Sequence, residues 1–246
     1  FQLLSCYQDL IGNLIKPTEA IYNMVIGSLL KGSIKAYEQQ NSNGSDFYKI
    51  AVDLFQASNA KKNHQFSKEL LDYSLLAMNL YPGYIRFSYV KNVLESSSLY
   101  TKDAFYYVAM LSYAKLTNDN KSIKELYQEF RSMCSVRKDL QESQYEIYSM
   151  VLAGMVETGD LPLAIKLLDK LMIDVRDKNG LAKNVSLMLS NFLISLSKVD
   201  CHKAHKLWFE FSRLKWVPEF SYEFYLVLLA NSFKDWSLTK KIYDYI

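Results

Sequence analysis

The chain has 246 residues, of which 50% are hydrophobic and 22% are charged, and its formal net charge at pH 7 is +3. This composition is typical of a folded protein with a sizeable core, and it excludes the disordered and collagen-like classes. The small net charge excludes a strongly basic nucleic-acid-binding class, but it is compatible with a local strip of lysines.

Apolar residues recur at helical spacing along nearly the whole chain, and no segment alternates in the way that is typical of strands. Residues 39–45, with the sequence Q-Q-N-S-N-G-S, are predicted to form an exposed loop insertion. The chain is therefore predicted to be all-α. The expected helices, in chain order, span residues 19–38, 46–58, 67–80, 84–95, 102–116, 121–134, 144–158, 161–173, 182–198, 201–213, 220–234 and 237–245.

The cysteines, the apolar runs and the first residue of the sequence indicate the compartment of the protein and whether the chain is part of a longer one. Cys6, Cys134 and Cys201 are an odd number of cysteines, far apart and without metal-ligand spacing, which favours a reducing compartment over a disulfide framework. No run of eighteen apolar residues is present, so no membrane span is expected. Because the sequence begins at Phe1 and not at Met, we expect a fragment of a longer protein.

Five segments of the chain resemble one another. Each starts with Tyr or Leu, has apolar residues three and four positions later, a small or short polar residue six later, and in all but one case Lys nine later. A helical hairpin cannot bury its apolar face alone, whereas a stack of hairpins can. We therefore expect residues 1–246 to form one array, a right-handed α-solenoid of about six hairpins. The five starts are Tyr22, Tyr106, Tyr148, Leu189 and Tyr225.

The repeats resemble the pentatricopeptide repeat family, in particular its divergent fungal mitochondrial members. The best unit is residues 148–171, Y-S-M-V-L-A-G-M-V-E-T-G-D-L-P-L-A-I-K-L-L-D-K-L, and K-W-V-P-E at 215–219 resembles the turn that ends a repeat. The resemblance implies binding of single-stranded RNA, about one base per repeat, because unpaired bases expose edges that short polar side chains can read.

The resemblance also implies which residues read bases. In this family the residue after the aromatic start is a base reader, and a second reader closes the repeat, near Asn179 for the unit that starts at Tyr148. Tyr107 and Leu226 depart from the family pattern of short polar residues at this position. The predicted base-reading residues are Asn23, Ser74, Tyr107, Ser149, Asn179 and Ser190.

The lysine nine residues after each start lies near the RNA backbone in this family. These lysines are predicted to form a ladder of phosphate contacts, which Glu157 interrupts. The alternative is that each lysine only caps a solvated helix end, where a cation also favours the helix dipole. The four lysines are Lys31, Lys115, Lys198 and Lys234.

Catalytic and metal-binding patterns are not found in the sequence. Cys201, His202 and His205 form its only Cys/His cluster, and two ligands one helical turn apart are too few for a metal site. The motifs of P-loops, zinc proteases, nucleophile elbows and zinc deaminases are absent. No enzyme activity, cofactor or metal is therefore predicted.

The expected function is sequence-selective binding of single-stranded RNA in the mitochondrial matrix. Family analogy implies a role in transcript processing, stability or translation, with RNA-processing proteins or the mitochondrial ribosome as further partners. The alternative is a helical-repeat scaffold that binds protein, which the low net charge, Glu146, Glu223 and the many aromatic residues favour. A helical enzyme domain, the third reading, would need clustered ionisable groups in a closed pocket.

Overall fold

The structure is a computed structural model that describes residues 2–59, 65–85, 87–97, 100–176, 182–214 and 220–245. These residues form fourteen α-helices and no strand, which confirms the all-α prediction. No described helix combines the length and the apolar character needed to cross a membrane. The chain divides into two compact units, Phe1–Lys102 and Asp103–Ile246.

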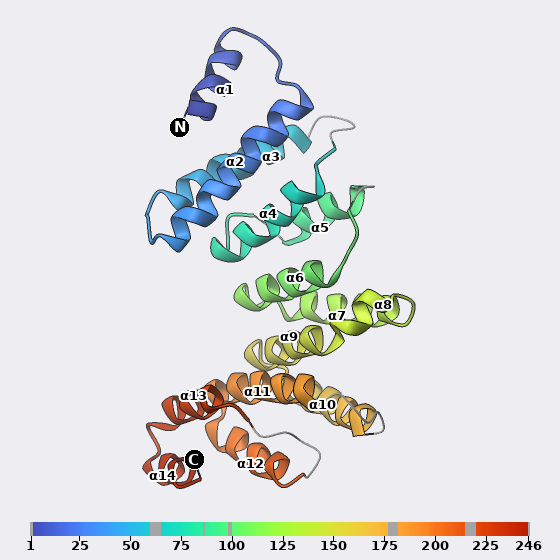
Figure 1. The fold of residues 1–246 in the computed structure, drawn as a ribbon, viewed down its shortest axis with the longest axis vertical. Helices are drawn as coiled ribbons and strands as arrows, with labels where there is room; N and C mark the ends of the chain where they lie inside the picture. The colour runs from blue at the N-terminus through green and yellow to red at the C-terminus, as the bar shows by residue number, and fades with distance from the viewer. Residues whose placement is uncertain are drawn as a thin grey trace. The chain divides into compact units, whose positions relative to one another are not determined.

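The described residues of the first unit form five helices, and α2 packs along α3 and also contacts α4 (Figure 1). Thr18 caps the start of α2 by accepting a hydrogen bond from the Ile21 amide, and Ser67 caps α4 in the same way through the Leu70 amide. The helices are α1 (Gln2–Gly12), α2 (Glu19–Glu38), α3 (Gly44–Asn59), α4 (Lys68–Leu80) and α5 (Phe87–Ser96).

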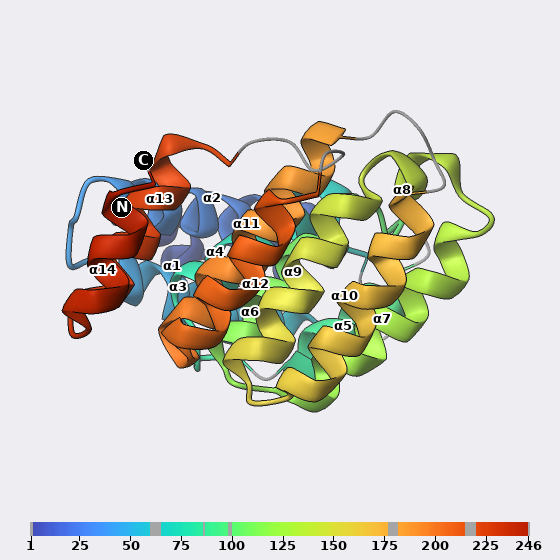
Figure 2. The same cartoon turned by 90° about the horizontal axis from the view of Figure 1, so that it is seen from below.

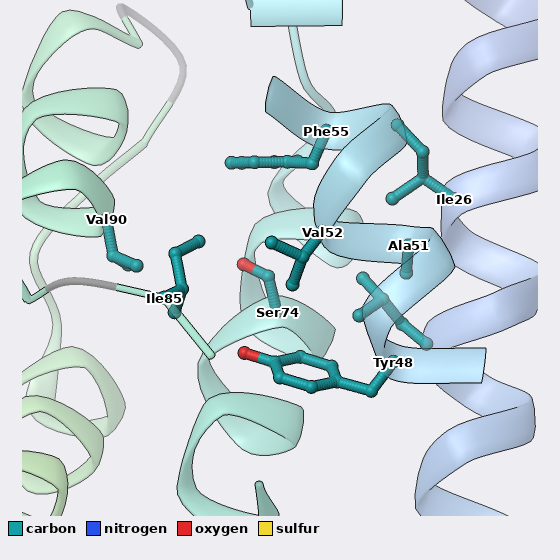
Figure 3. Close-up of a pocket in the computed structure, with 9 residues that line it drawn as sticks. Ile26, Tyr48, Ala51, Val52, Phe55, Ser74, Ile85 and Val90 are labelled. Atoms are coloured by element: carbon teal, nitrogen blue, oxygen red, sulfur yellow. The ribbon is translucent and has the colours of Figure 1, made fainter. Parts of the chain in front are cut away.

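The core of the first unit lies where α2, α3, α4 and α5 meet. A small apolar pocket of about 20 Å³ remains there, which is room for no more than a water molecule. Figure 3 shows Ser74 of α4 among Tyr48 and Val52 of α3 and Ile85. The pocket is therefore a packing gap in the core and not a ligand site.

The connection between α2 and α3 is shorter than predicted. Helix α3 begins at Gly44, so Gly44 and Ser45 belong to the helix and not to the exposed loop, and Gly44 is buried. A Cβ atom at Gly44 would overlap the hydroxyl of Tyr81. That hydroxyl donates a hydrogen bond of 2.9 Å to the Ser33 carbonyl oxygen. Glycine at this position thus permits the contact between α3 and Tyr81.

The part of the second unit that the structure describes forms four helical hairpins, each of which pairs a first helix with a second one. The first helices α6, α9, α11 and α13 contact one another in that order, and we call them the first-helix row (Figure 1). The helices are α6 (Ala104–Leu116), α7 (Asn120–Cys134), the short α8 (Lys138–Glu142), α9 (Gln144–Glu157), α10 (Leu161–Arg176), α11 (Ala182–Val199), α12 (Cys201–Ser212), α13 (Tyr222–Ser232) and α14 (Trp236–Tyr243).

The second helices pack against the first helices of their own hairpins. The pairs are α6 with α7, α9 with α10, α11 with α12, and α13 with α14. Figure 2 shows α9 and α10 lying side by side as such a pair. Helix α9 is apolar nearly all round, as expected for a buried helix, and it contacts neighbouring helices on several sides.

The position six residues after each repeat start has a packing role in three hairpins. A Cβ atom at Gly154 of α9 would lie 2.9 Å from the Cδ1 atom of Ile123 on α7, so the glycine allows close helix approach. The equivalent Ser195 and Asn231 donate hydrogen bonds to Glu157 and Ser197 of the preceding hairpins. The self-similarity in the sequence thus corresponds to contacts between hairpins.

Each hairpin turn of the second unit ends with an aspartate that caps the second helix. The carboxylate accepts a hydrogen bond from the backbone amide three residues later, which satisfies a donor that the first helical turn leaves open. The donor–acceptor distances are 2.9–3.3 Å. The four capping residues are Asp119, Asp160, Asp200 and Asp235.

Candidate RNA-binding surface

The ends of the first helices in the second unit bring three of the predicted ladder positions together. The Nζ atom of Lys115 on α6 lies 3.8 Å from Oε2 of Glu157 on α9. The Nζ atom of Lys198 on α11 lies 3.4 Å from Oε1 of the same carboxylate. Two of the predicted phosphate-binding lysines therefore share one counter-ion in this structure.

Glu157, which interrupts the lysine pattern in the sequence, is the centre of this cluster. Its Oε1 atom also accepts a hydrogen bond of 2.8 Å from the Ser195 hydroxyl. The Glu157 side chain is only 23% exposed, so its contacts with α6 and α11 are partly shielded from solvent. The carboxylate thus joins three consecutive first helices.

Lys31, the first of the four predicted ladder lysines in chain order, lies in the first unit. Its Nζ atom lies 2.9 Å from Oε1 of Glu69 and 4.7 Å from the centre of the Tyr73 ring. The hydrogen bond with Glu69 raises the pKa of Lys31 and, in turn, lowers the pKa of Glu69. Like Lys115 and Lys198, this lysine has a carboxylate partner.

A hollow between α9 and α11 contains one predicted base reader. Ser149 is 1% exposed, and its Oγ atom accepts a hydrogen bond of 2.7 Å from Nδ2 of Asn191 on α11. Asn191 is not among the predicted site residues, although it lies two residues after the start at Leu189. We call this the base hollow, and its lining residues are Glu142, Ser143, Tyr145, Glu146, Ser149, Met150, Leu187 and Asn191.

Two other predicted base readers lie in the second unit's interior. Tyr107 is fully buried, and its hydroxyl donates a hydrogen bond of 3.2 Å to Oε1 of Glu129. Burial, reinforced by the Glu129 charge, raises the pKa of this tyrosine. Ser190 is 9% exposed. Both side chains are buried in the protein, and their predicted role in reading RNA bases stays a prediction.

The remaining predicted base readers lie elsewhere. Ser74 borders the core pocket of the first unit, and its hydroxyl donates to the Leu71 carbonyl at 2.7 Å. Asn23 donates through Nδ2 to the Gln65 carbonyl at 3.1 Å, which links α2 to the segment before α4. Asn179 lies outside the described residues. Among the five positions that the structure describes, Ser149 is the one that lines the base hollow.

A second depression lies between the α11–α12 turn and the α13–α14 turn. Lys234, the last predicted ladder lysine, lies there between the exposed aromatic residues Phe233 and Trp236, which sequence reasoning missed despite the visible F-K-D-W pattern. We call it the turn cleft. Its lining residues are Ser197, Lys198, Val199, Cys201, His202, Asn231, Ser232, Phe233, Lys234, Asp235, Trp236, Ser237 and Leu238.

The two histidines of the Cys/His cluster contact different neighbours and do not face a common site. Nε2 of His202 lies 3.1 Å from Oδ2 of Asp235, whereas the His205 ring packs against Trp208 with its centre 5.2 Å away. Burial, together with the charges of Lys241 and His202, lowers the pKa of His205. Within the described part of the chain, no three Cys, His, Asp or Glu side chains are grouped to hold a metal ion.

The sequence of this chain is similar to that of one protein family and one curated protein. The family model for the mitochondrial ribonuclease P subunit (RPM2) matches residues 1–35. Over 228 residues, which cover 89% of this chain, the sequence is 55% identical to the mitochondrial ribonuclease P protein component of Saccharomyces cerevisiae. The chain spans 19% of the length of that yeast protein. The chain therefore belongs to the family of the mitochondrial ribonuclease P protein component. The predicted mitochondrial location is confirmed.

Proposed function

We propose that this chain is a helical-repeat segment that binds single-stranded RNA in mitochondrial RNA processing, as part of a ribonuclease P protein. The observation that carries the proposal is the 55% identity to the yeast ribonuclease P protein component across 89% of the chain. The row of first helices supports it, because a stack of hairpins of the pentatricopeptide type offers one continuous face to an unpaired strand.

In this proposal the base hollow receives one nucleobase. The Asn191 amide donates to Ser149 through Nδ2, and its Oδ1 atom is left to accept a hydrogen bond from an exocyclic amino group of the base. Leu187, which is 55% exposed, and Met150 supply apolar surface for the base plane. The hollow thus combines an edge reader with apolar walls.

The lysines at the ends of the first helices would meet the phosphates. An RNA phosphate would compete with Glu157 for Lys115 and Lys198, because both ammonium groups already lie near that carboxylate. Affinity would therefore fall as salt rises, since each phosphate contact releases condensed counterions. The chain would bind and position RNA, while another component of the ribonuclease carries out the cleavage.

The proposal is narrower than the function expected from the sequence. The name of the yeast relative refers to ribonuclease P, and it gives no support to transcript stability, translation or a ribosome partner. The proposed partners are consequently single-stranded RNA and further components of the same ribonuclease. The divergent pentatricopeptide solenoid remains part of this proposal.

Fluorescence anisotropy with labelled RNA tests the proposal. We expect the chain to bind a single strand more tightly than a duplex of the same sequence, and to lose affinity as salt is raised. Asn191→Ala should weaken binding of the preferred sequence about tenfold, the size of one lost base contact. Lys170→Ala, an exposed lysine on α10, is the matched control. The proposal would be overturned if the chain showed no saturable binding to any single-stranded RNA at low salt. It would also be overturned if Lys170→Ala lost as much RNA affinity as Asn191→Ala.

A second candidate is a scaffold that binds protein. Glu142 and Glu146 line the base hollow, and Glu157 reduces the positive charge of the neighbouring lysines. These carboxylates would favour a basic peptide over an RNA strand. The scaffold would be favoured if the parent chain retained a protein at high salt and protected no RNA from nuclease.

A further inference from the structure

The turn cleft is lined by basic and aromatic side chains from two hairpin turns. Lys198 and His202 lie on the wall that the α11–α12 turn forms, and Lys234 and Trp236 lie on the wall from the α13–α14 turn. The cleft has a volume of about 910 Å³ and is open to solvent. Sites for small molecules typically enclose roughly 300–1,000 Å³, so one nucleotide fits.

We infer that the turn cleft is a second RNA contact, which holds one unpaired nucleotide with its base against the Trp236 ring and its phosphate at Lys234. The inference rests on the proposed RNA binding but not on the base hollow. It involves no base-edge reader, so this contact would add affinity with little sequence preference. An open cleft also lets the strand enter at one side and leave at the other.

Two exposed aromatic side chains are the first argument for this site. Trp236 is 77% exposed and Phe233 is 69% exposed, although burial of such large rings would stabilise the fold. They flank Lys234 within four consecutive residues. Exposed aromatic side chains beside a cation are the arrangement on which unpaired bases stack, because every base offers a flat face whatever its sequence.

The distribution of charge is the second argument. Within the described part of the chain, no carboxylate pairs with Lys234, whose Nζ atom lies 5.7 Å from the centre of the Phe233 ring. The one carboxylate that lines the cleft, Asp235, is already engaged. Its Oδ1 atom caps the Leu238 amide, and its Oδ2 atom lies 3.1 Å from Nε2 of His202. The cleft therefore offers an ammonium group to an anionic occupant.

The test measures binding of a labelled single-stranded RNA to the whole 246-residue chain. Trp236→Ala should weaken binding about tenfold, the size of one lost base stack. Lys234→Ala should weaken all sequences by a similar factor and reduce the slope of log affinity against log salt by about one. The matched controls are Tyr243→Ala and Lys240→Ala, exposed residues of α14 outside the cleft, which should bind as the parent does. An abasic strand of equal length should bind the parent and Trp236→Ala alike.

The outcomes separate this inference from the proposed function. If Trp236→Ala and Lys234→Ala bind RNA as the parent does while Asn191→Ala is weakened, the cleft inference is wrong and the proposed function stands. If the parent binds no single-stranded RNA, both are wrong. Loss of a protein partner in Trp236→Ala with unchanged RNA affinity would also overturn the inference, since the cleft would then hold a peptide. Circular dichroism of each variant checks that these surface changes leave the fold intact.

Discussion

The junction between the first two hairpin turns of the second unit is closed, whereas the junction between the last two is an open cleft. At the closed junction, Nδ2 of Asn120 donates to Oγ1 of Thr158 at 3.0 Å, and Nζ of Lys124 lies 2.5 Å from Oδ2 of Asp160. At the open junction Trp236, which like Asn120 directly follows the capping aspartate, is exposed. The same aspartate cap thus occurs both at a sealed seam and beside an open cleft.

The turns themselves explain part of this difference. Asn118 and Gly159, at the closed junction, both have left-handed backbone conformations with φ of 56° and 88°. In each turn the following aspartate amide donates to a carbonyl five residues earlier, which is the Schellman ending of a helix. The turns before Asp200 and Asp235 lack such a residue. The first pair of turns is joined by Asn120, Thr158, Lys124 and Asp160, while the last pair is bridged by His202 and Asp235 and has the turn cleft beside that contact.

The largest expected effect concerns the core beside the closed junction. The buried Phe130 ring of α7 lies 5.3 Å from the Tyr107 ring of α6 and 5.5 Å from the Tyr148 ring of α9. Phe130→Ala should lower the free energy of unfolding by about 3–5 kcal/mol, because it leaves a cavity among three helices. Urea denaturation measures this, with Phe209→Ala, a 41% exposed ring on α12, as the control. Equal losses in the two variants would contradict the assignment of this core.

A smaller effect is expected at the seam itself. Thr158→Val removes the hydroxyl that accepts from Asn120 but keeps the shape of the side chain. The Nδ2 group of Asn120 then loses its acceptor, and the Gly154 carbonyl loses the hydrogen bond that the Thr158 hydroxyl donates at 2.8 Å, which should cost about 1–2 kcal/mol of unfolding free energy. The exposed Thr101→Val is a matched control that should change stability by less than about 0.5 kcal/mol. A neutral Thr158→Val would show that the hydrogen bond does not hold the seam.

The ion pair at the seam predicts a dependence on pH. The hydrogen bond from Lys124 lowers the pKa of the Asp160 carboxyl below its ordinary value. Its contribution is therefore present above the unfolded-state pKa and is lost as the pH falls through the folded-state pKa. Asp160→Asn keeps a good capping side chain but removes the charge, and should cost under about 1 kcal/mol at pH 7. The difference in melting temperature should shrink as the pH falls below the ordinary pKa of an aspartate, and a difference independent of pH would contradict this prediction.

The smallest perturbation tests how open the turn cleft is. Trp236 is 77% exposed and Trp208 is 1% exposed. In a Trp216→Phe background, a chain that retains only Trp236 should be quenched by acrylamide several-fold more strongly than one that retains only Trp208. Addition of single-stranded RNA should then protect Trp236 and leave Trp208 unchanged. Similar quenching of both tryptophans would show that the cleft is closed in solution.

The sequence predicted most of the helices because their apolar residues recur at helical spacing. The expected helix at 19–38 coincides with α2, and others differ from the structure by a few residues at their ends. Helices α1 and α8 were not expected. Helix α8 has only five residues, too few to show a period, and α1 precedes the first of the similar segments, which starts at Tyr22.

The candidate site was less predictable, because its contacts join residues about forty positions apart. In the sequence, Glu157 only interrupts the lysine pattern, whereas in the structure its carboxylate lies near both Lys115 and Lys198. Asn191 is the partner of Ser149, yet no local pattern in one sequence pairs them. Tyr107 occupies a repeat position equivalent to Ser149, and both side chains are buried, but only Ser149 lines the base hollow, whereas the Tyr107 hydroxyl donates to Glu129. Repeat spacing gives the position of a side chain along a helix, whereas its neighbours decide whether it is accessible.

The four aspartate caps have a consequence for how this chain can change. Each hairpin of the second unit carries its own signal for starting the second helix, at Asp119, Asp160, Asp200 and Asp235. An in-frame duplication or deletion of one whole hairpin would therefore preserve every turn that it leaves behind. The length of such a protein, and with it the length of the strand it could cover, can evolve in steps of one hairpin without new turn chemistry.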